Sequence, residues 1–338
     1  MKRLLLLLLL AAGALTPLRA APYSHTEETG SLPRSRFLAD TLLHKNEITY
    51  CIAMPDGEDE FLNTGHISLM VQAALREWTH GIALRIRAAG RAEEMADILR
   101  ILDKPLTLTR LPACDLTRHP LMPKVHPDFD PAGEKADLTV IVSSAYCTHL
   151  RGQVNSFFIF EYKDTSPFMC LLNGYANPVR SPAAQDYFPM ANTQEDKALA
   201  TDAEAVFRRA AQGGYDTAFQ TRLWRLNRLF EFDGHAFFAI IAHELGHAFG
   251  LGDEYLTDRP CAYASQTPGE GLMFNGYQPI SCDEVDGMIT LLDRFAGKKR
   301  TFASFCSGRG LIQNGQEVPP AEPLSDRLAE RLLPLIRH

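Results

Sequence analysis

The chain has 338 residues, of which 46% are hydrophobic and 22% charged, a composition typical of a globular protein with one large domain or two smaller ones. The formal net charge is -7 and no long basic run is present, which argues against nucleic acid as a partner. The sequence contains no internal repeat that would indicate a solenoid or propeller.

The first 21 residues have the layout of a secretory signal peptide. MKR supplies positive charge, LLLLLLLAAGAL is an apolar run, and small residues offer a cleavage site near Ala20 or Ala21. The apolar run is too short to span a bilayer comfortably, so we expect no stable membrane anchor after cleavage. Cleavage removes Lys2, Arg3 and Arg19, which brings the net charge from -7 to near -10 (-7 - 3). The sequence therefore predicts a secreted or periplasmic protein.

The next part of the chain predicts a strand followed by a long helix. Residues 22–45 are polar and unpatterned, and we expect a tether or a short prosegment there. EITYCIAM (47–54) alternates and is rich in β-branched residues, which predicts a strand. From Asn63 onward, apolar residues recur at helical spacing as far as Trp78, with Asn63 or Thr64 as the N-cap.

A second helical piece is expected at 91–102, and four strands are expected after it, at 105–111, 136–146, 155–163 and 168–174. A long loop over 175–192 follows, and then helical segments at 193–211 and 217–232. This order of elements predicts an α/β layer architecture without a second independent domain. It runs from a strand to a long helix, then to further strands and a histidine-bearing helix.

The seven cysteines all lie in the part predicted to be exported, at positions 51, 114, 147, 170, 261, 282 and 306. They show no metal-binding spacing, so some should form disulfides, and the odd number leaves at least one unpaired. Pairing of Cys261 with Cys282 or Cys306 is plausible, and a free thiol remains open for Cys51.

The segment FDGHAFFAIIAHELGHAFGLGDEY (232–255) carries the chemistry of the chain. On a helix, His243 and His247 lie one turn apart on the same side, so both imidazoles can bind a single ion. Glu244 stands beside the first histidine, where it can accept a proton from an attacking water. Helices whose histidines only pack together are the alternative to a metal site, but the residues that follow favour the metal.

Gly250 is placed to end this helix, because glycine enters the left-handed cap conformation at little cost. The chain can then turn back and bring Asp253 to the metal as a third ligand. Three protein ligands and one open position are the catalytic arrangement of zinc, so we expect one catalytic Zn²⁺ ion.

AHELGHAFGLGD resembles the extended zinc motif of the metzincin metallopeptidases, HExxHxxGxxH, with Asp as the third ligand. That family also has a methionine-containing turn beneath the zinc, and GEGLMFNGYQP supplies Met273 for it. The resemblance covers roughly residues 46–295. It implies a zincin-like α/β fold with a mixed twisted sheet, a long active-site helix and a smaller C-terminal subdomain below the cleft.

The implied catalytic domain runs over 46–310, with an upper part to about residue 255 and a lower part from 256, followed by a tail at 311–338 with a short helix. Asp253 has a neighbouring carboxylate at Glu254, so either can be the third ligand. Tyr255 and Tyr277 are candidates for stabilising an oxyanion, although an aromatic residue near a helix end more often has a packing role. Asn275 stands where some metzincins have an additional tyrosine ligand.

These features predict an exported zinc endopeptidase that hydrolyses proteins or peptides with Glu244 as general base. A substrate could add as an extended strand along 155–163, if that strand is not interior. The alternatives are a non-catalytic binding module on the same scaffold and a zinc amidase acting on cell-wall peptides. His149 and His235 are expected to pack rather than bind the ion, and GKKR (297–300) is expected to be a solvated turn.

Overall fold

The computed structural model describes residues 37–58, 62–114, 136–143, 168–171, 192–229, 237–251, 271–275, 278–313 and 316–318. The predicted signal peptide, the predicted strand at 155–163 and the predicted helix of the C-terminal tail lie outside these ranges, as do His149 and His235. Within the described ranges, no helix is long and apolar enough to cross a membrane.

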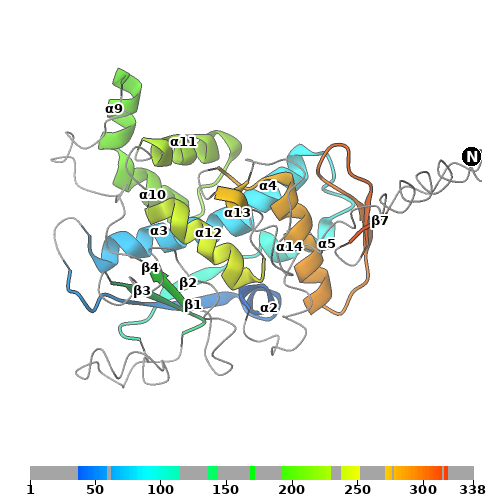
Figure 1. Ribbon diagram of the computed structural model, residues 1–338, viewed down its shortest axis with the longest axis horizontal. Coiled ribbons are helices and arrows are strands. Elements are labelled where there is room, and N and C mark those ends of the chain that lie inside the picture. The colour runs from blue at the N-terminus through cyan, green and yellow to red at the C-terminus, as the bar shows by residue number, and fades with distance from the viewer. Residues whose placement is uncertain are drawn as a thin grey trace, which may run out of the picture.

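A four-stranded parallel sheet forms one layer of the fold (Figure 1). Its strands are, in spatial order, β2 (Thr107–Arg110), β1 (Glu47–Ala53), β3 (Leu138–Val142) and β4 (Phe168–Leu171). The four corresponding sequence predictions are confirmed. Within this four-stranded sheet every described pairing is parallel, whereas the metzincin resemblance implies a mixed sheet.

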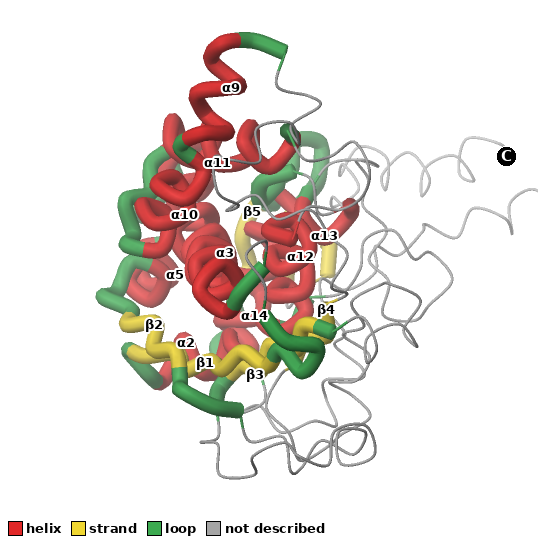
Figure 2. Tube along the Cα trace, turned by 90° about the vertical axis from the view of Figure 1, so that its left-hand side faces the viewer, coloured by secondary structure: helices red, strands yellow, loops and turns green. Residues whose placement is uncertain are grey.

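Helices α3 and α12 lie on the same face of this sheet (Figure 2). Helix α3 (Thr64–Arg76) follows β1 and begins at Asn63, whose side-chain oxygen accepts a hydrogen bond from His66 N at 3.0 Å. This confirms the predicted cap. The predicted apolar stripe is buried against the sheet and α12, and it consists of Ile67, Met70, Val71, Ala74, Leu75 and Trp78.

The helix continues beyond its predicted stripe through an irregular turn. A π-helical segment, η3 (Glu77–Gly81), joins α3 to α4 (Ile82–Ala88) without a break in the chain direction. Such π-bulges are rare and frequently occur at functional sites. Two of its fully buried residues, Glu77 and Trp78, contact segments far away in the sequence.

Part of the predicted N-terminal tether is a structural helix. Helix α2 (Leu38–His44) buries Leu38, Ala39 and Leu42 completely, and it contacts both α12 and α14. The prediction of a tether or prosegment over residues 22–45 is therefore wrong for its C-terminal part, where α2 is folded into the core. The helix is only seven residues long, too short for its apolar spacing to be recognised among polar neighbours.

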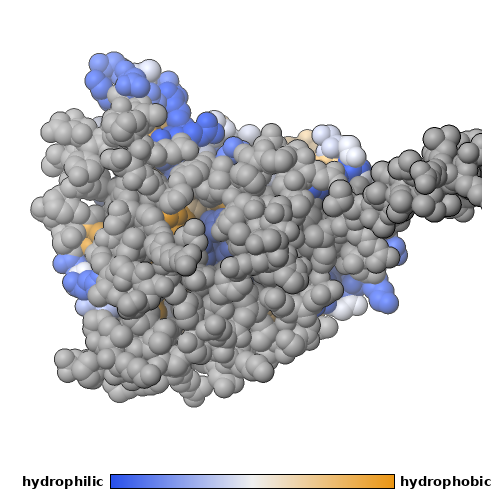
Figure 3. Space-filling model, in the orientation of Figure 1, coloured by the Kyte–Doolittle hydropathy of each residue, from blue (hydrophilic) through white to orange (hydrophobic). Residues whose placement is uncertain are grey.

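Four further helices lie in the described part of the chain before residue 230. They are α5 (Ala96–Leu102), α9 (Gln194–Thr201), α10 (Ala203–Ala211) and α11 (Thr217–Arg228), so the single helical segment predicted for 193–211 is divided at Asp202. Helix α10 packs on α3, whereas the surface of α9 is hydrophilic, as Figure 3 shows.

The C-terminal part contains α13 (Leu272–Asn275), α14 (Cys282–Phe295) and an antiparallel sheet of β5 (Thr301–Ala303), β6 (Leu311–Gln313) and β7 (Gln316–Val318). The domain boundary expected at residue 310 falls inside this sheet, because β6 pairs with both β5 and β7.

The segment GKKR is more than a solvated turn. Arg300 Nε lies 2.6 Å from the buried carboxylate of Asp293, and its Nη2 lies 2.6 Å from Asp97. The prediction of a purely solvated turn is therefore wrong at its last residue, where an ion pair ties the strand β5 region to α14 and α5.

Two disulfides lie within the described part of the chain. Cys51 pairs with Cys114, and Cys282 pairs with Cys306. The free thiol considered for Cys51 and the pairing of Cys261 with either later cysteine are therefore both wrong. The fold brings the observed partners together: the Cα–Cα distance is 5.3 Å for Cys51 and Cys114 and 5.0 Å for Cys282 and Cys306, within the range of disulfides.

Candidate metal centre

Helix α12 (Phe237–Phe249) is apolar apart from three side chains. It contacts α2, α3, η3, α13 and β4, and a helix enclosed in this way is expected to be hydrophobic on all sides. His243, Glu244 and His247 are the exceptions, and each is less than 10% exposed, at 8%, 6% and 4%. Buried polar groups need polar partners, so these three residues require a specific explanation.

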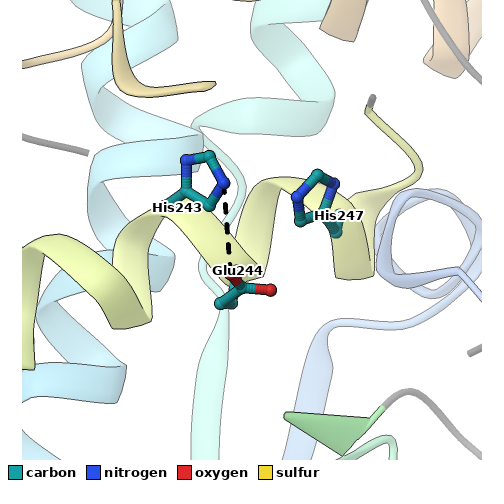
Figure 4. Close-up of side chains that lie close together, drawn as sticks. All are labelled: His243, Glu244 and His247. Carbon is teal, nitrogen blue, oxygen red and sulfur yellow. Dashed lines mark ion pairs between the residues drawn. The ribbon is translucent and has the colours of Figure 1, made fainter. Parts of the chain in front are cut away.

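The two histidines lie on the same side of α12 (Figure 4), with ring centroids 5.0 Å apart. His243 Nδ1 lies 2.8 Å from the carbonyl oxygen of Leu272, and His247 Nδ1 lies 2.8 Å from that of Leu251. A carbonyl oxygen can only accept, so both Nδ1 atoms donate and carry the ring proton. The lone pair of each neutral imidazole is therefore on Nε2, the nitrogen suited to bind a metal.

Glu244 completes a compact group of possible ligand atoms. One ligand atom from each of His243, Glu244 and His247 lies within 4.8 Å of the other two. Glu244 Oε1 lies 4.0 Å from His243 Nε2, as the dashed line in Figure 4 marks. The carboxylate is thus beside the ring nitrogens.

The end of α12 positions the partner of His247. Gly250 has φ +117°, a left-handed conformation that glycine adopts most readily. Leu251 N donates to Gly246 O at 2.9 Å and Gly250 N donates to His247 O at 2.9 Å, which is the Schellman pattern of a helix end. This turn returns the chain over the helix, so that the Leu251 carbonyl accepts the His247 ring proton.

Met273 and Trp78 form an apolar floor against the middle of the motif. A Cβ atom placed on Gly246 would collide with Met273 Sδ and would stand 2.6 Å from Trp78 Cζ2. The indole Nε1 of Trp78 also donates to the carbonyl of Ala242 at 2.6 Å. Both side chains are buried, at 1% and 0% exposure, so the glycine between the histidines is needed for this close packing.

A buried carboxylate holds the Met273 segment in place. Glu284 is 1% exposed, and its Oε1 accepts from Met273 N at 2.8 Å. Its Oε2 accepts from Ser281 N at 2.6 Å and from the Ser281 hydroxyl, which forms a capping box at the start of α14. Burial raises the pKa of Glu284, and the hydrogen bonds from Ser281 and Met273 oppose that rise.

A second buried carboxylate lies in the π-helical segment. Glu77 Oε1 accepts from Gln220 Nε2 at 2.8 Å and from Ile280 N at 3.1 Å. Complete burial raises the pKa of Glu77 to about 7, against the hydrogen bonds that favour the ionised form. Glu77 therefore joins η3, α11 and the segment that leads into α14.

Five of the predicted site positions lie in the described part of the chain, and the others lie outside it. His243, Glu244 and His247 lie together, Gly250 ends the helix, and Met273 lies beneath Gly246. Asp253, Glu254, Tyr255 and Tyr277 fall outside the described residues, as does the side chain of Asn275.

Several functional positions have no counterpart in the sequence predictions. The carbonyls of Leu251 and Leu272 leave no side-chain signature, and Trp78 reads as an ordinary member of the apolar stripe. Glu284 could have been found, because Ser281 and Glu284 match the spacing of a capping box before the apolar positions of α14.

The described part of the chain contains a second group of possible metal ligands, but it is less suited to zinc than His243, Glu244 and His247. That second group is Cys282, Asp283 and Cys306, but its two sulfurs are joined in a disulfide and offer no thiolate. Two neutral imidazoles with a nearby carboxylate are donors that could hold a divalent metal ion such as zinc. A comparison of the chain with family models, with curated proteins and with solved structures finds no match.

Proposed function

We propose that the protein is an exported zinc-dependent endopeptidase with a metzincin-like fold. The observation that carries the proposal is the pair of imidazoles on α12, each with its Nδ1 tied to a backbone carbonyl. Both rings therefore present Nε2 as the metal-binding nitrogen, and Glu244 lies next to them.

The proposed zinc ligands are His243 and His247, together with a carboxylate from Asp253 or Glu254. A zinc ion held by these residues would supply Lewis acidity toward water and toward a peptide carbonyl. With three protein ligands, the ion would keep one position for substrate chemistry, which would distinguish the site from a closed structural site.

Glu244 is the proposed general base. Its carboxylate would take one proton from the attacking water while the oxygen of that water bonds to the peptide carbon. The same residue would then pass the proton to the nitrogen of the leaving amine as the carbon–nitrogen bond breaks.

Export is supported by two independent features. The first 21 residues have the layout of a signal peptide, and the described part of the chain contains two disulfides. Disulfides form and persist in oxidising compartments such as the periplasm and the extracellular space.

The function is tested by zinc content and casein cleavage of the wild type and of Glu244→Ala. We expect both proteins to bind one zinc and only the wild type to cut casein, because the variant keeps the histidines but lacks the base. Zinc binding without cleavage of any protein or peptide by the wild type would leave a binding module as the better description. Cleavage of cell-wall peptides alone would favour an amidase.

The third ligand is tested by two single variants. We expect Asp253→Ala to lose zinc and Glu254→Ala to keep it, because Asp253 has the spacing of the third ligand in the metzincin motif. The opposite result would assign Glu254 as the ligand without affecting the roles of the two histidines.

A further inference from the structure

One peptide group connects the buried carboxylate of Glu284 with the candidate metal ligand His243. The carbonyl of this peptide belongs to Leu272 and accepts from His243 Nδ1 at 2.8 Å. Its N–H belongs to Met273 and donates to Glu284 Oε1 at 2.8 Å. The carboxylate and the imidazole therefore bind opposite ends of the same amide.

Such an arrangement couples the two side chains electronically. The amide group is a resonance system, so a carboxylate that attracts the N–H increases the negative charge on the carbonyl oxygen. That oxygen then accepts the His243 ring proton more strongly. Acceptors on the second nitrogen of a ligand histidine fix the ring orientation and increase the basicity of the metal-binding nitrogen.

Helix capping alone does not explain this contact. The capping box uses Glu284 Oε2, which accepts from Ser281, the residue that precedes α14. Glu284 Oε1 instead reaches a backbone N–H eleven residues earlier in the chain. A capping glutamate could leave this second oxygen in solvent, whereas Glu284 is 1% exposed.

The backbone at Gly271 leaves room for the Glu284 carboxylate to reach Met273 N. Gly271 has φ +105°, and a Cβ atom placed there would stand 2.5 Å from Glu284 Oε1 and 2.9 Å from Ser281 Oγ. A side chain at this position would thus displace the carboxylate from the Leu272–Met273 peptide. The close approach requires both the conformation and the small size of glycine.

We propose that Glu284 is a positioning residue for the metal centre, acting on His243 through the Leu272–Met273 peptide. It holds the His243 ring with Nδ1 protonated and strengthens Nε2 as a ligand. This inference rests on the proposed function, since it assigns a role in metal binding, but the hydrogen-bonded link can be measured separately from zinc binding.

The test compares apoproteins of the wild type, Glu284→Gln and Asp293→Asn. Glu284→Gln keeps the side-chain size and removes the charge. Asp293→Asn is the matched control, because Asp293 is a buried carboxylate on the same helix whose partner is Arg300 rather than the Met273 segment. Thermal unfolding of each apoprotein confirms that the variants are folded.

Two quantities are then measured: the zinc dissociation constant by competition with a chromophoric chelator, and the ¹H–¹⁵N signal of the His243 ring. We expect Glu284→Gln to bind zinc about tenfold more weakly than the wild type, at the lower end of the effect of outer ligand partners. Its His243 Nδ1–H signal should move upfield as the hydrogen bond weakens. Asp293→Asn should match the wild type in both measurements.

Equal zinc affinity and an unmoved His243 signal in Glu284→Gln would overturn the inference. A wild type that binds no zinc would instead refute the proposed function, while the ring signal of the apoprotein would still report on the link from Glu284. If Glu284→Gln does not fold, scalar couplings across hydrogen bonds in the wild type decide the question. Couplings from His243 to Leu272 and from Met273 to the Glu284 carboxylate are expected, and absence of the second would refute the link.

Discussion

Gly246, between the two histidines of α12, sets how closely the motif approaches its apolar floor. Its missing side chain makes room for Met273 and Trp78, which pack directly against the helix backbone. The same helix turn carries both imidazoles, so crowding at this point would shift the ligands relative to one another. The glycine is therefore part of the site's geometry, although it offers no functional group.

We expect Gly246→Ala to destabilise the protein by at least about 2 kcal/mol, because the new methyl overpacks a rigid interior. Helix propensity alone predicts a change of about 1 kcal/mol in the opposite direction. Urea unfolding of the apoprotein measures whether the free energy of unfolding falls or rises. A variant as stable as the wild type or more stable would show that Met273 and Trp78 can move away without cost.

At single residues, the chemical motif was predictable and its support was not. His243, Glu244, His247 and Gly250 could be assigned from spacing because helix periodicity places them relative to one another. The carbonyls that hold the rings come from Leu251 and from Leu272, twenty-nine residues after His243. Backbone acceptors do not depend on residue type, so no sequence pattern identifies them.

Among the elements, the start of α14 connects the small C-terminal sheet with the candidate metal centre. The Cys282–Cys306 disulfide and an ion pair between Asp283 and Arg309, at 2.5 Å, fasten the first turn of the helix. Phe305 N also donates to Asp286 at 2.9 Å. Glu284 lies among these contacts, so the disulfide helps to fix the carboxylate that binds Met273.

We expect Cys282→Ser with Cys306→Ser to lower stability by about 3 kcal/mol, the effect of opening a loop of this length. Zinc affinity should fall as well, because the first turn of α14 loses a restraint next to Glu284. The matched control is Cys51→Ser with Cys114→Ser, which opens the longer loop, of separation 63 instead of 24. It should lower stability at least as much but leave zinc affinity unchanged, as judged by urea unfolding and chelator competition. Equal zinc affinity in both double variants would contradict this.

Helices and strands could be predicted where the periodic pattern of apolar residues extended over a long enough segment. The stripe from Ile67 to Trp78 gave α3 and its cap, and alternating or β-branched runs gave the strands of the sheet. Helix α2 was missed because seven residues show too little periodicity. The π-bulge at Glu77–Gly81 was missed because it depends on tertiary contacts of Glu77 and Trp78 rather than on local sequence.

At the scale of the whole molecule, Glu77 links three parts of the chain through one buried carboxyl group. It contacts Gln220 of α11 and Ile280 before α14 from its position in η3. Its pKa, raised to about 7 by burial, exceeds the ordinary value of 4.5. Folding is therefore coupled to proton binding at this residue.

The sign of this coupling follows from the two pKa values. Below pH 4.5 the Glu77 carboxyl is neutral in both the folded and the unfolded state, and its contribution to the free energy of unfolding is fully present. Between pH 4.5 and about 7 the unfolded chain releases the proton while the folded protein keeps it, so stability falls by roughly 3 kcal/mol in total. Above pH 7 both states are ionised and this contribution is constant.

We expect Glu77→Gln to remove this decline and to be more stable than the wild type at pH 8, because the amide still accepts from Gln220 and Ile280 without ionising. Unfolding in urea at intervals from pH 4.5 to 8 measures the difference between the two proteins. Glu204→Gln, at an exposed carboxylate on α10, is the control and should keep the wild-type slope. A slope that persists in Glu77→Gln would assign the pH dependence to other groups.

We propose above that α12 holds a metal through two imidazole nitrogens, and the fold fixes the orientation of both rings. Anomalous diffraction at the zinc absorption edge, from crystals of the zinc-loaded full chain, tests it most directly. We expect one zinc at about 2.0–2.1 Å from Nε2 of His243 and of His247, with Nδ1 of each ring still on the carbonyls of Leu272 and Leu251. Zinc bound elsewhere with the α12 histidines unligated, or bound through Nδ1 after both rings turn, would contradict the claim.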